Sequence, residues 1–339
     1  MQNVLIIQLR QLGDILLSTP VIRAIKSEWP DARVSFLSHP MGRLILDGNP
    51  LLHQHLVMPT EGVLQQAKFL SHLRQNRFSL VFDFMGNPRS ALATLMTGAP
   101  VRVGMKSTRD WAYTKVLPRI SGDDYIVKEK FRLLSACGLT PVDQRLMLTW
   151  GERDLVGPLA WIAEHQGFRD SPMRVALSPT HRRENRRWSA RNWACLADQL
   201  VGRFGAGVVW VWGPGEEEEV KAIQSLCTAK TWMAPKTSFK ELAAMIAQCE
   251  LFIANSNGPS HVAVAVNTPS IQLHGPTDAP SWSPLTERHR VLTGPKIEDI
   301  SVDSVVNLVA EMSPVVSLDL KKRGGVDSDE SVWMYRPTL

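Results

Sequence analysis

A carboxylate stands where the first apolar run of the chain ends. The run 4–9 predicts a buried strand, and the residues after it lead through Thr19 and Pro20 directly into a helix, so Asp14 lies at the bend. Ligands of parallel α/β sheets bind beyond the carboxyl ends of strands, where a helix N-terminus offers free N–H groups and partial positive charge. Asp14 is therefore a candidate for chemistry, and the alternative is that it only caps the helix.

A turn of small polar residues follows another apolar run, at 252–261. Ser256, Asn257 and Gly258 would let backbone amides approach a phosphate closely, and Pro259 suits the first turn of a helix whose dipole attracts an anion. The alternative is a capped helix that binds nothing. His261 alone is more typical of a packed, hydrogen-bonded histidine than of a catalyst.

Two more loops follow predicted strands and carry charge. The loop 178–188 is rich in arginine, which can clamp a diphosphate bidentately; Arg186 is the candidate, whereas Arg182 and Arg183 are interpreted as solvated charges. The acidic run 216–219 is interpreted mainly as negative charge that stabilises the N-terminus of a helix.

A third loop, 273–284, contains three prolines. It is either a rigid loop that positions a ligand or a simple end to the preceding strand.

Apolar runs alternate with amphipathic segments along the whole chain, a rhythm typical of parallel βαβ units. Strands are predicted at 4–9, 34–37, 80–84, 101–103, 174–177, 207–212, 251–254 and 270–273. Helices are predicted at 20–29, 61–75, 155–165, 190–204, 216–226, 239–248 and 259–266.

The length of 339 residues fits two domains of about 150 residues each. The pattern predicts two doubly wound, Rossmann-like domains, at 1–155 and 156–316, with a cleft expected between them. After Val315 the composition turns polar, so 317–339 is predicted to be a flexible tail.

Missing motifs argue against several classes of protein. GxGxxG after the first strand, GxxxxGK[ST], HExxH, GxSxG and CxxC are all absent, which disfavours a dehydrogenase, a P-loop enzyme, a zinc hydrolase and an α/β-hydrolase. The four cysteines are predicted to be small buried residues. With no signal segment and no stretch approaching 18 apolar residues, a cytoplasmic protein is expected.

The net charge of +5 favours anionic partners, and it is assigned mainly to the basic runs 182–191 and 321–323. No continuous basic face with interleaved aromatic residues is recognisable, so nucleic acid is not an expected partner.

Taken in order, these segments resemble glycosyltransferase family 9, the ADP-heptose:lipopolysaccharide heptosyltransferases. Residues 10–14 with 16–20 look like the family's opening signature, and 82–90 look like a second strand and turn. The segments that follow in the family's order are 186–188, 213–216, 258–261 and 275–278, so the likeness spans residues 3–311.

The resemblance implies a GT-B architecture and metal-independent transfer with inversion at the anomeric carbon. It implies that Asp14 is the general base for an acceptor hydroxyl, that Arg186 replaces a lysine facing the donor phosphates, and that Ser256 replaces the usual donor-binding Asp. The further residues that it implies are Thr180, Glu216, Asn257, Gly258 and His261 for the donor, and Arg10, Gly13 and Asn87 for the acceptor or cleft.

The implied donor is ADP-heptose or a related ADP-sugar, with no cofactor and no metal. The implied acceptor is an anionic glycolipid, the lipopolysaccharide inner core, met at the cytoplasmic face of the inner membrane. Two alternatives stay open: a nucleotide-sugar 2-epimerase of the same architecture, and a non-catalytic sugar-nucleotide-binding protein, which Ser256 favours.

Overall fold

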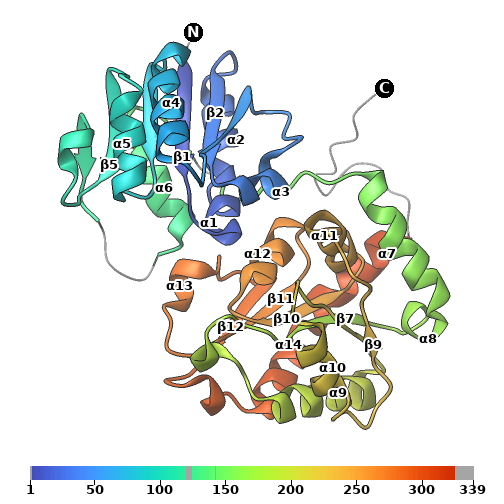
Figure 1. Ribbon diagram of the computed structural model, residues 1–339. Coiled ribbons are helices and arrows are strands. Elements are labelled where there is room, and N and C mark those ends of the chain that lie inside the picture. Colours follow the sequence, from blue (N-terminus) through green and yellow to red (C-terminus); the bar gives the residue numbers. More distant parts are fainter. Residues whose placement is uncertain (1, 120–123, 142, 325–339) are drawn as a thin grey trace. The chain divides into compact units, whose positions relative to one another are not determined.

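Two parallel sheets of six strands form the framework of the molecule (Figure 1). The structure, a computed structural model, describes residues 2–119, 124–141 and 143–324. Its contacts divide the chain into a first unit, Met1–Thr149, and a second unit, Trp150–Leu339. Each unit contains one of the sheets.

The sheet of the first unit has the strand order β3-β2-β1-β4-β5-β6, and every pairing is parallel. Val4 of β1 pairs with Val34 on one side and with Leu80 on the other, so β1 lies in the middle. The strands are β1 Asn3–Gln8, β2 Arg33–Ser38, β3 Gln54–Val57, β4 Leu80–Asp83, β5 Val101–Met105 and β6 Lys115–Leu117.

Helices connect these strands and pack on the sheet. Helix α2 contacts α6, and α4 contacts α5 (Figure 1). The α-helices are α1 Leu12–Leu16, α2 Thr19–Glu28, α3 Arg43–Leu46, α4 Val63–Leu73, α5 Pro88–Met96 and α6 Ile126–Ser135, with short 3-10 turns η1 Pro40–Gly42, η2 Arg74–Asn76 and η3 Asp110–Ala112.

The sheet of the second unit repeats this topology. Its order is β12-β11-β10-β7-β8-β9, again parallel throughout, so β7 and β10 occupy the places that β1 and β4 occupy in the first unit. The strands are β7 Arg174–Ser178, β8 Gly207–Trp210, β9 Trp232–Met233, β10 Leu251–Asn255, β11 Ser270–His274 and β12 His289–Thr293.

The helices of the second unit form two groups. Helix α9 contacts α10 and α14, whereas α11 contacts α7 and α12. The helices are α7 Glu152–Glu164, α8 Gln166–Arg169, α9 Ala190–Phe204, α10 Glu217–Gln224, α11 Phe239–Ala247, α12 Gly258–Ala265, α13 Ala279–Trp282 and α14 Val302–Gly324, with the 3-10 turns η4 Glu184–Arg186 and η5 Ile297–Asp299. None of the described helices is both long and apolar enough to cross a membrane.

The two doubly wound folds predicted from the sequence are confirmed, with all eight predicted strands and all seven predicted helices present within a few residues. The four strands that the sequence did not predict are β3, β6, β9 and β12, and they are the two edges of each sheet. An edge strand is covered by a neighbour on one side only, so its residues are only partly buried and give no continuous apolar run.

Three expectations need correction. The contacts place the change of unit at 149/150 and not at 155/156, because all of α7 packs against α11 of the second unit. Residues 317–324 of the expected tail continue α14, which the structure describes as far as Gly324; residues 325–339 lie outside the described part. All four cysteines are free, but only Cys249 is buried, and Cys195 is exposed on α9.

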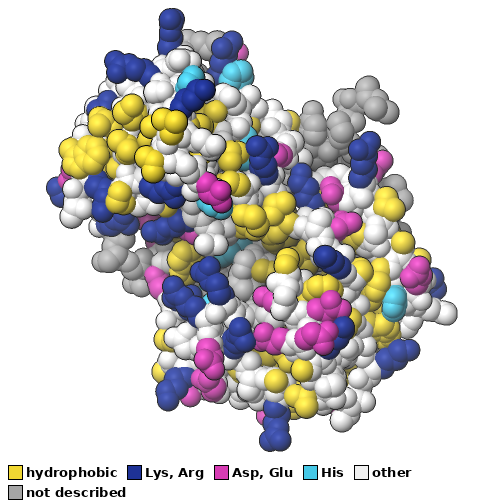
Figure 2. Space-filling model, in the orientation of Figure 1, with side chains coloured by type: hydrophobic (Ala, Val, Ile, Leu, Met, Phe, Trp, Pro, Cys, Tyr) yellow, Lys and Arg dark blue, Asp and Glu magenta, His cyan; other side chains and the backbone are white. Residues whose placement is uncertain are grey.

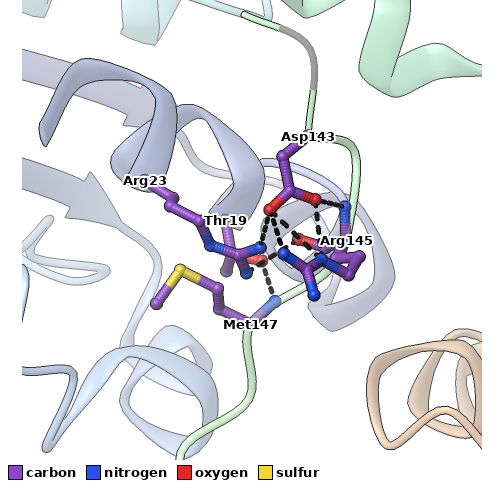
Figure 3. Close-up of polar contacts among 5 residues, drawn as sticks. All are labelled: Thr19, Arg23, Asp143, Arg145 and Met147. Carbon is purple, nitrogen blue, oxygen red and sulfur yellow. Dashed lines mark hydrogen bonds and ion pairs between the residues drawn. The ribbon is translucent and has the colours of Figure 1, made fainter. Parts of the chain in front are cut away.

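Residues 143–147, close to the end of the first unit, are held against α2 by ion pairs and hydrogen bonds (Figure 3). The carboxylate of Asp143 lies between the guanidinium groups of Arg23 and Arg145, and Arg23 also donates to the Arg145 carbonyl at 3.1 Å. The Met147 N–H donates to Thr19 Oγ1 at 2.8 Å. Partial burial acts to raise the pKa of Asp143, but the hydrogen bonds from Arg145 and Arg23 outweigh it and hold the pKa well below its usual range.

We expect Asp143→Asn to lower the stability of the first unit by about 1–2 kcal/mol, because two guanidinium groups lose their anion. The measurement is the urea dependence of hydrogen exchange in β1, with Asp31→Asn, an exposed position after α2, as the control. Since the pKa of Asp143 is depressed by folding, the difference between wild type and variant is full above the ordinary Asp range and shrinks as the pH falls below it. A difference that does not change with pH would contradict this account.

Candidate active site

In sheets of this topology, ligands bind at the carboxyl ends of the central strands. In both units the chain leaves the two central strands toward opposite faces, and open α/β sheets bind ligands beyond the carboxyl ends of strands at such a point. The central strands are β1 and β4 in the first unit, and β7 and β10 in the second. The residues singled out from the sequence follow these four strands and β8.

Asp14 is the third residue of α1, which begins after a connection of three residues from the end of β1. The residues Leu9–Gln11 separate strand and helix, so the sequence expectation of a direct passage is wrong, and α1 has only 5 residues. The alternative interpretation of Asp14 as a helix cap is also wrong, because Gln11 occupies the cap position. The Asp14 carbonyl accepts from Ser18 Oγ at 2.7 Å and from Lys130 Nζ at 3.3 Å, which fixes its backbone.

Burial and nearby positive charges both act on the carboxyl group of Asp14. Burial raises the pKa of the Asp14 carboxyl, while the positive charges of Lys130 and Arg10 act in the opposite direction. A half-buried carboxylate whose pKa is raised is a better proton acceptor than an ordinary surface aspartate. Two further predicted residues lie close to Asp14 in the chain. Gly13 is in α1, and Arg10 is in the connection between β1 and α1.

Lys130 is the residue of this site that sequence reasoning missed. It is only 4% exposed, its ammonium lies 5.9 Å from the centre of the Phe84 ring, and burial lowers its pKa to about 8 against the opposing charge of Asp14. The signal was present in α6, where Val127, Lys130 and Leu134 have the spacing of one helix face. A lysine on the buried face of an amphipathic helix needs an anion or a ligand nearby.

The turn after β4 is organised by a buried carboxylate. Asp83 Oδ1 accepts the N–H groups of Met85 at 2.8 Å and Gly86 at 3.2 Å, and Oδ2 accepts the Tyr113 hydroxyl at 2.8 Å. Gly86 has a φ of 65°, a conformation that favours glycine. Asn87, predicted to line the acceptor site, caps α5 by accepting the Ser90 N–H at 2.8 Å. Its side-chain oxygen is therefore committed to the fold.

In the second unit, hydrogen bonds join the loops that follow β7, β8 and β10. Thr180 Oγ1 donates to Glu216 Oε2 at 2.8 Å, and the same oxygen accepts the Gly213 N–H at 2.8 Å. Asn257 Nδ2 donates to the Thr180 carbonyl and to Ser178 Oγ, each at 3.0 Å, while its Oδ1 caps α12. Three predicted donor residues, Thr180, Glu216 and Asn257, are thus brought together and hold one another in place.

Arg186 is the cation of this site. It ends η4 half-buried, and within the described ranges no carboxylate forms an ion pair with it, whereas Arg187 pairs with Glu219 at 2.9 Å. Arg182 and Arg183 are exposed, as predicted. Arg186 lies close to two histidines: burial and its charge lower the pKa of His274 to about 4, and burial is likewise the main cause of the lowered pKa of His181. A half-buried arginine without a carboxylate partner among the described residues is suited to bind an anion.

The loop after β10 approaches this cation. The His181 ring donates a hydrogen bond to the Ser256 backbone, and Gly275 comes so close to the carbonyl of Asn185 that an added Cβ would lie 3.4 Å from it. Ser256 and Gly258 therefore belong to the same cluster of loops as Arg186. His261 is 7% exposed and lies one turn into α12, with its ring 6.3 Å from that of Trp282.

A buried amide fixes the shape of this cluster and had no assigned role in the sequence analysis. Asn255, fully buried at the end of β10, donates to the Pro179 carbonyl at 2.5 Å and accepts the Trp188 N–H at 3.3 Å. The loop that carries Arg186 is thereby fixed at both ends. Among the described residues, no group of three or more His, Cys, Asp or Glu side chains is arranged to hold a metal ion.

Comparison with known proteins identifies the class of molecule to which these features belong. The model of glycosyltransferase family 9 (heptosyltransferase) matches residues 66–317. Lipopolysaccharide heptosyltransferase 3 of Escherichia coli K12 is 30% identical over 295 residues, covering 82% of this chain and 84% of that protein. The chain belongs to glycosyltransferase family 9, and it is a glycosyltransferase.

Solved structures agree on the fold. A family 9 glycosyl transferase from Veillonella parvula superimposes with a TM-score of 0.83 and 20% identity, covering 92% of this chain and 97% of that one. The ADP-heptose lps heptosyltransferase II of E. coli gives a TM-score of 0.74 and 20% identity, covering 95% and 100%. The two sheets therefore form a GT-B fold, as the sequence resemblance implied.

We expect Lys130→Met to raise the pKa of Asp14 further, because the variant removes a positive charge that favours the carboxylate. With a pKa of about 8, Lys130 is protonated throughout the range in which Asp14 titrates. The measurement is an NMR titration of the Asp14 carboxyl carbon.

The control for this titration is Lys128→Met, which removes an exposed lysine of the same helix that pairs with Asp124. Equal Asp14 pKa values in the two variants would show that Lys130 does not act on this carboxylate.

Proposed function

We propose that this protein transfers a heptose from ADP-heptose to the lipopolysaccharide inner core. The names of its relatives support this donor and acceptor, since they include lipopolysaccharide heptosyltransferase 3 and an ADP-heptose heptosyltransferase. The observation that carries the chemistry is Asp14, a half-buried carboxylate with a raised pKa beyond the central strand of the first unit.

The proposed reaction is a single displacement. Asp14 takes the proton of the acceptor hydroxyl as its oxygen attacks the anomeric carbon of the heptose. The bond between that carbon and the diphosphate breaks, and ADP leaves with the electron pair. Attack from the side opposite the leaving group inverts the configuration, and the proposed reaction uses no metal. Arg186 offsets the negative charge that develops on the leaving diphosphate.

The donor is proposed to bind at the loops of the second unit. Arg186 supplies a bidentate contact to the diphosphate, and Gly258 supplies a backbone N–H group. The Ser256 N–H already donates to the Leu273 carbonyl at 3.0 Å, so Ser256 contributes its side-chain hydroxyl. Thr180, Glu216 and Asn257 fix the shape of these loops through their mutual hydrogen bonds. His261 follows on α12, with its ring 6.3 Å from that of Trp282. Because Ser256 replaces the family's usual aspartate, the sugar of the donor is contacted by a neutral hydroxyl at that position.

The acceptor is proposed to bind at the first unit, beside Arg10, Gly13 and the turn at Asn87. An anionic glycolipid acceptor places the enzyme at the cytoplasmic face of the inner membrane, as a peripheral protein. The general test is a panel of nucleotide sugars and truncated glycolipid cores, in which transfer adds the mass of one heptose to the acceptor. Release of a free epimer without any acceptor would instead favour the 2-epimerase alternative.

Asp14→Asn is expected to lower kcat by about 10²- to 10⁴-fold, the usual contribution of a general base, with donor affinity unchanged. Transfer of radiolabelled heptose and calorimetric binding of ADP measure the two quantities separately. Asp31→Asn is the matched control, since it neutralises an exposed aspartate of the same unit. Normal turnover by the Asp14 variant would remove the basis of the proposed mechanism, and binding of ADP-heptose without transfer by the wild type would favour the non-catalytic alternative.

Arg186→Ala is expected to raise the donor KM by roughly 10- to 100-fold, because a charged hydrogen-bond donor to the diphosphate is lost. Steady-state kinetics with varied ADP-heptose measure the effect, and Arg182→Ala is the control because it removes an exposed arginine of the same loop. If both variants keep the wild-type donor KM and kcat, Arg186 is not the phosphate ligand.

A further inference from the structure

One segment of the first unit has a net positive charge equal to that of the whole chain. The chain has 38 basic and 33 acidic residues, and six of the basic but only one of the acidic residues fall within 86–119, so the remainder of the chain is balanced at 32 of each. The six are Arg89, Arg102, Lys106, Arg109, Lys115 and Arg119, and the acidic one is Asp110, which pairs with Lys106. The runs 182–191 and 321–323 are basic as well, with net charges of +4 and +3, so residues 86–119 add a third basic segment to the two that the sequence analysis singled out.

The same segment also carries exposed apolar side chains. Twelve large hydrophobic residues are exposed within the part of the chain that the structure describes, and five of them lie here, with exposed fractions from 36% to 58%. They are Leu92, Leu95, Met96, Trp111 and Val116. Apolar side chains at this exposure gain free energy when another surface removes them from water.

These side chains come from elements that lie side by side. Leu92, Leu95 and Met96 are on α5, which packs against η3, the turn that carries Trp111; Ala91 and Ala112 share one small core. Val116 is on the edge strand β6, opposite Gly104, and the ring of Tyr113 occupies the space above Gly104. Figure 2 shows hydrophobic side chains gathered over this part of the first unit, with Lys and Arg side chains around them. We call this surface the α5–β6 face.

We propose that the α5–β6 face is the surface by which this protein binds an anionic lipid bilayer. Its composition fits that occupant on two counts: apolar side chains that include a tryptophan, the residue enriched at membrane–water interfaces, and basic residues that are attracted to anionic head groups. The inference deepens the proposed function, because an acceptor anchored in a membrane requires the enzyme to work at that membrane. The face binds lipid through its own residues and does not require the acceptor.

The charge distribution distinguishes a bilayer from other occupants. A second copy of this chain would bring another face of the same positive charge against the first, and the two would repel. Single-stranded nucleic acid is bound by several aromatic side chains on which bases stack, whereas this face exposes one. A fluid anionic surface complements both the charge and the apolar side chains.

The experiment is flotation of the full-length protein with acceptor-free vesicles, either of phosphatidylethanolamine with phosphatidylglycerol or of phosphatidylcholine alone. We expect binding to the anionic vesicles only, and weaker binding as salt is added. Arg89→Gln with Lys115→Gln should weaken binding about fivefold for each charge removed. Trp111→Ala should weaken it roughly tenfold, since an exposed indole no longer enters the interface.

Matched controls come from the second unit. Arg153→Gln with Arg191→Gln removes the same charge from exposed positions, and Val156→Ala removes a side chain that is 67% exposed on α7. The controls should bind anionic vesicles like the wild type. Unchanged thermal melting of every variant establishes that folding is intact, as expected for exposed positions.

Several outcomes would overturn the proposal: no binding of the wild type to anionic vesicles, equal binding to both kinds of vesicle, or equal loss in the control variants. A dimer in sedimentation that dissociates on Trp111→Ala would show that a second copy covers the face. Transfer to a soluble, acyl-free acceptor separates this question from the catalytic one. Variants of the face should keep full activity on that acceptor, so a lack of transfer by every protein would fault the proposed function and leave the vesicle result standing.

Discussion

The parallel pairing of all the described strands is the constraint on which the rest of the structure depends. Parallel strands bring every carboxyl end to one edge of the sheet, and the order found in both units sends the connections from the two central strands to opposite faces. In the first unit this places the bend with Asp14 next to the turn of Asp83, and in the second it places the Arg186 loop next to Ser256 and Asn257. The proposed catalytic carboxylate and the proposed phosphate-binding loop thus occupy equivalent positions of one topology.

Buried polar groups keep these positions fixed. Asp83 is buried at the end of β4 and accepts three hydrogen bonds. Asn255 is buried at the end of β10, where it donates to one loop carbonyl and accepts one backbone N–H. Leaving such groups without partners would be costly, so each holds its loop in one arrangement. The buried ammonium of Lys130 differs, because burial opposes its charge while the carboxylate of Asp14 supports it. The protonation of one of these two groups therefore depends on that of the other.

The sequence was sufficient for the central strands and for most helices, because strands covered on both faces are continuous apolar runs. It was not sufficient for the edge strands, such as Gln54–Val57 and Lys115–Leu117, whose residues are partly exposed. Within the site, the positions of Asp14, Arg186 and Glu216 could be predicted because each follows a recognisable strand. Lys130 could not, since its approach to Asp14 spans 116 residues of sequence and depends on how α6 packs. The hydrogen bonds of Asn87 and Asn257 to helix starts were likewise invisible, because an amide in a turn is equally suited to a cap and to a ligand.

The concentration of charge in residues 86–119 gives the first unit a permanent electric dipole moment. A protein with the same net charge spread evenly would be pulled toward a negative surface without regard to its orientation. Here the remaining nine-tenths of the chain is neutral on balance, so the field of such a surface exerts a torque as well as a pull. Within a Debye length, about 10 Å at moderate salt, rotation precedes contact, and productive collisions become a larger share of all collisions.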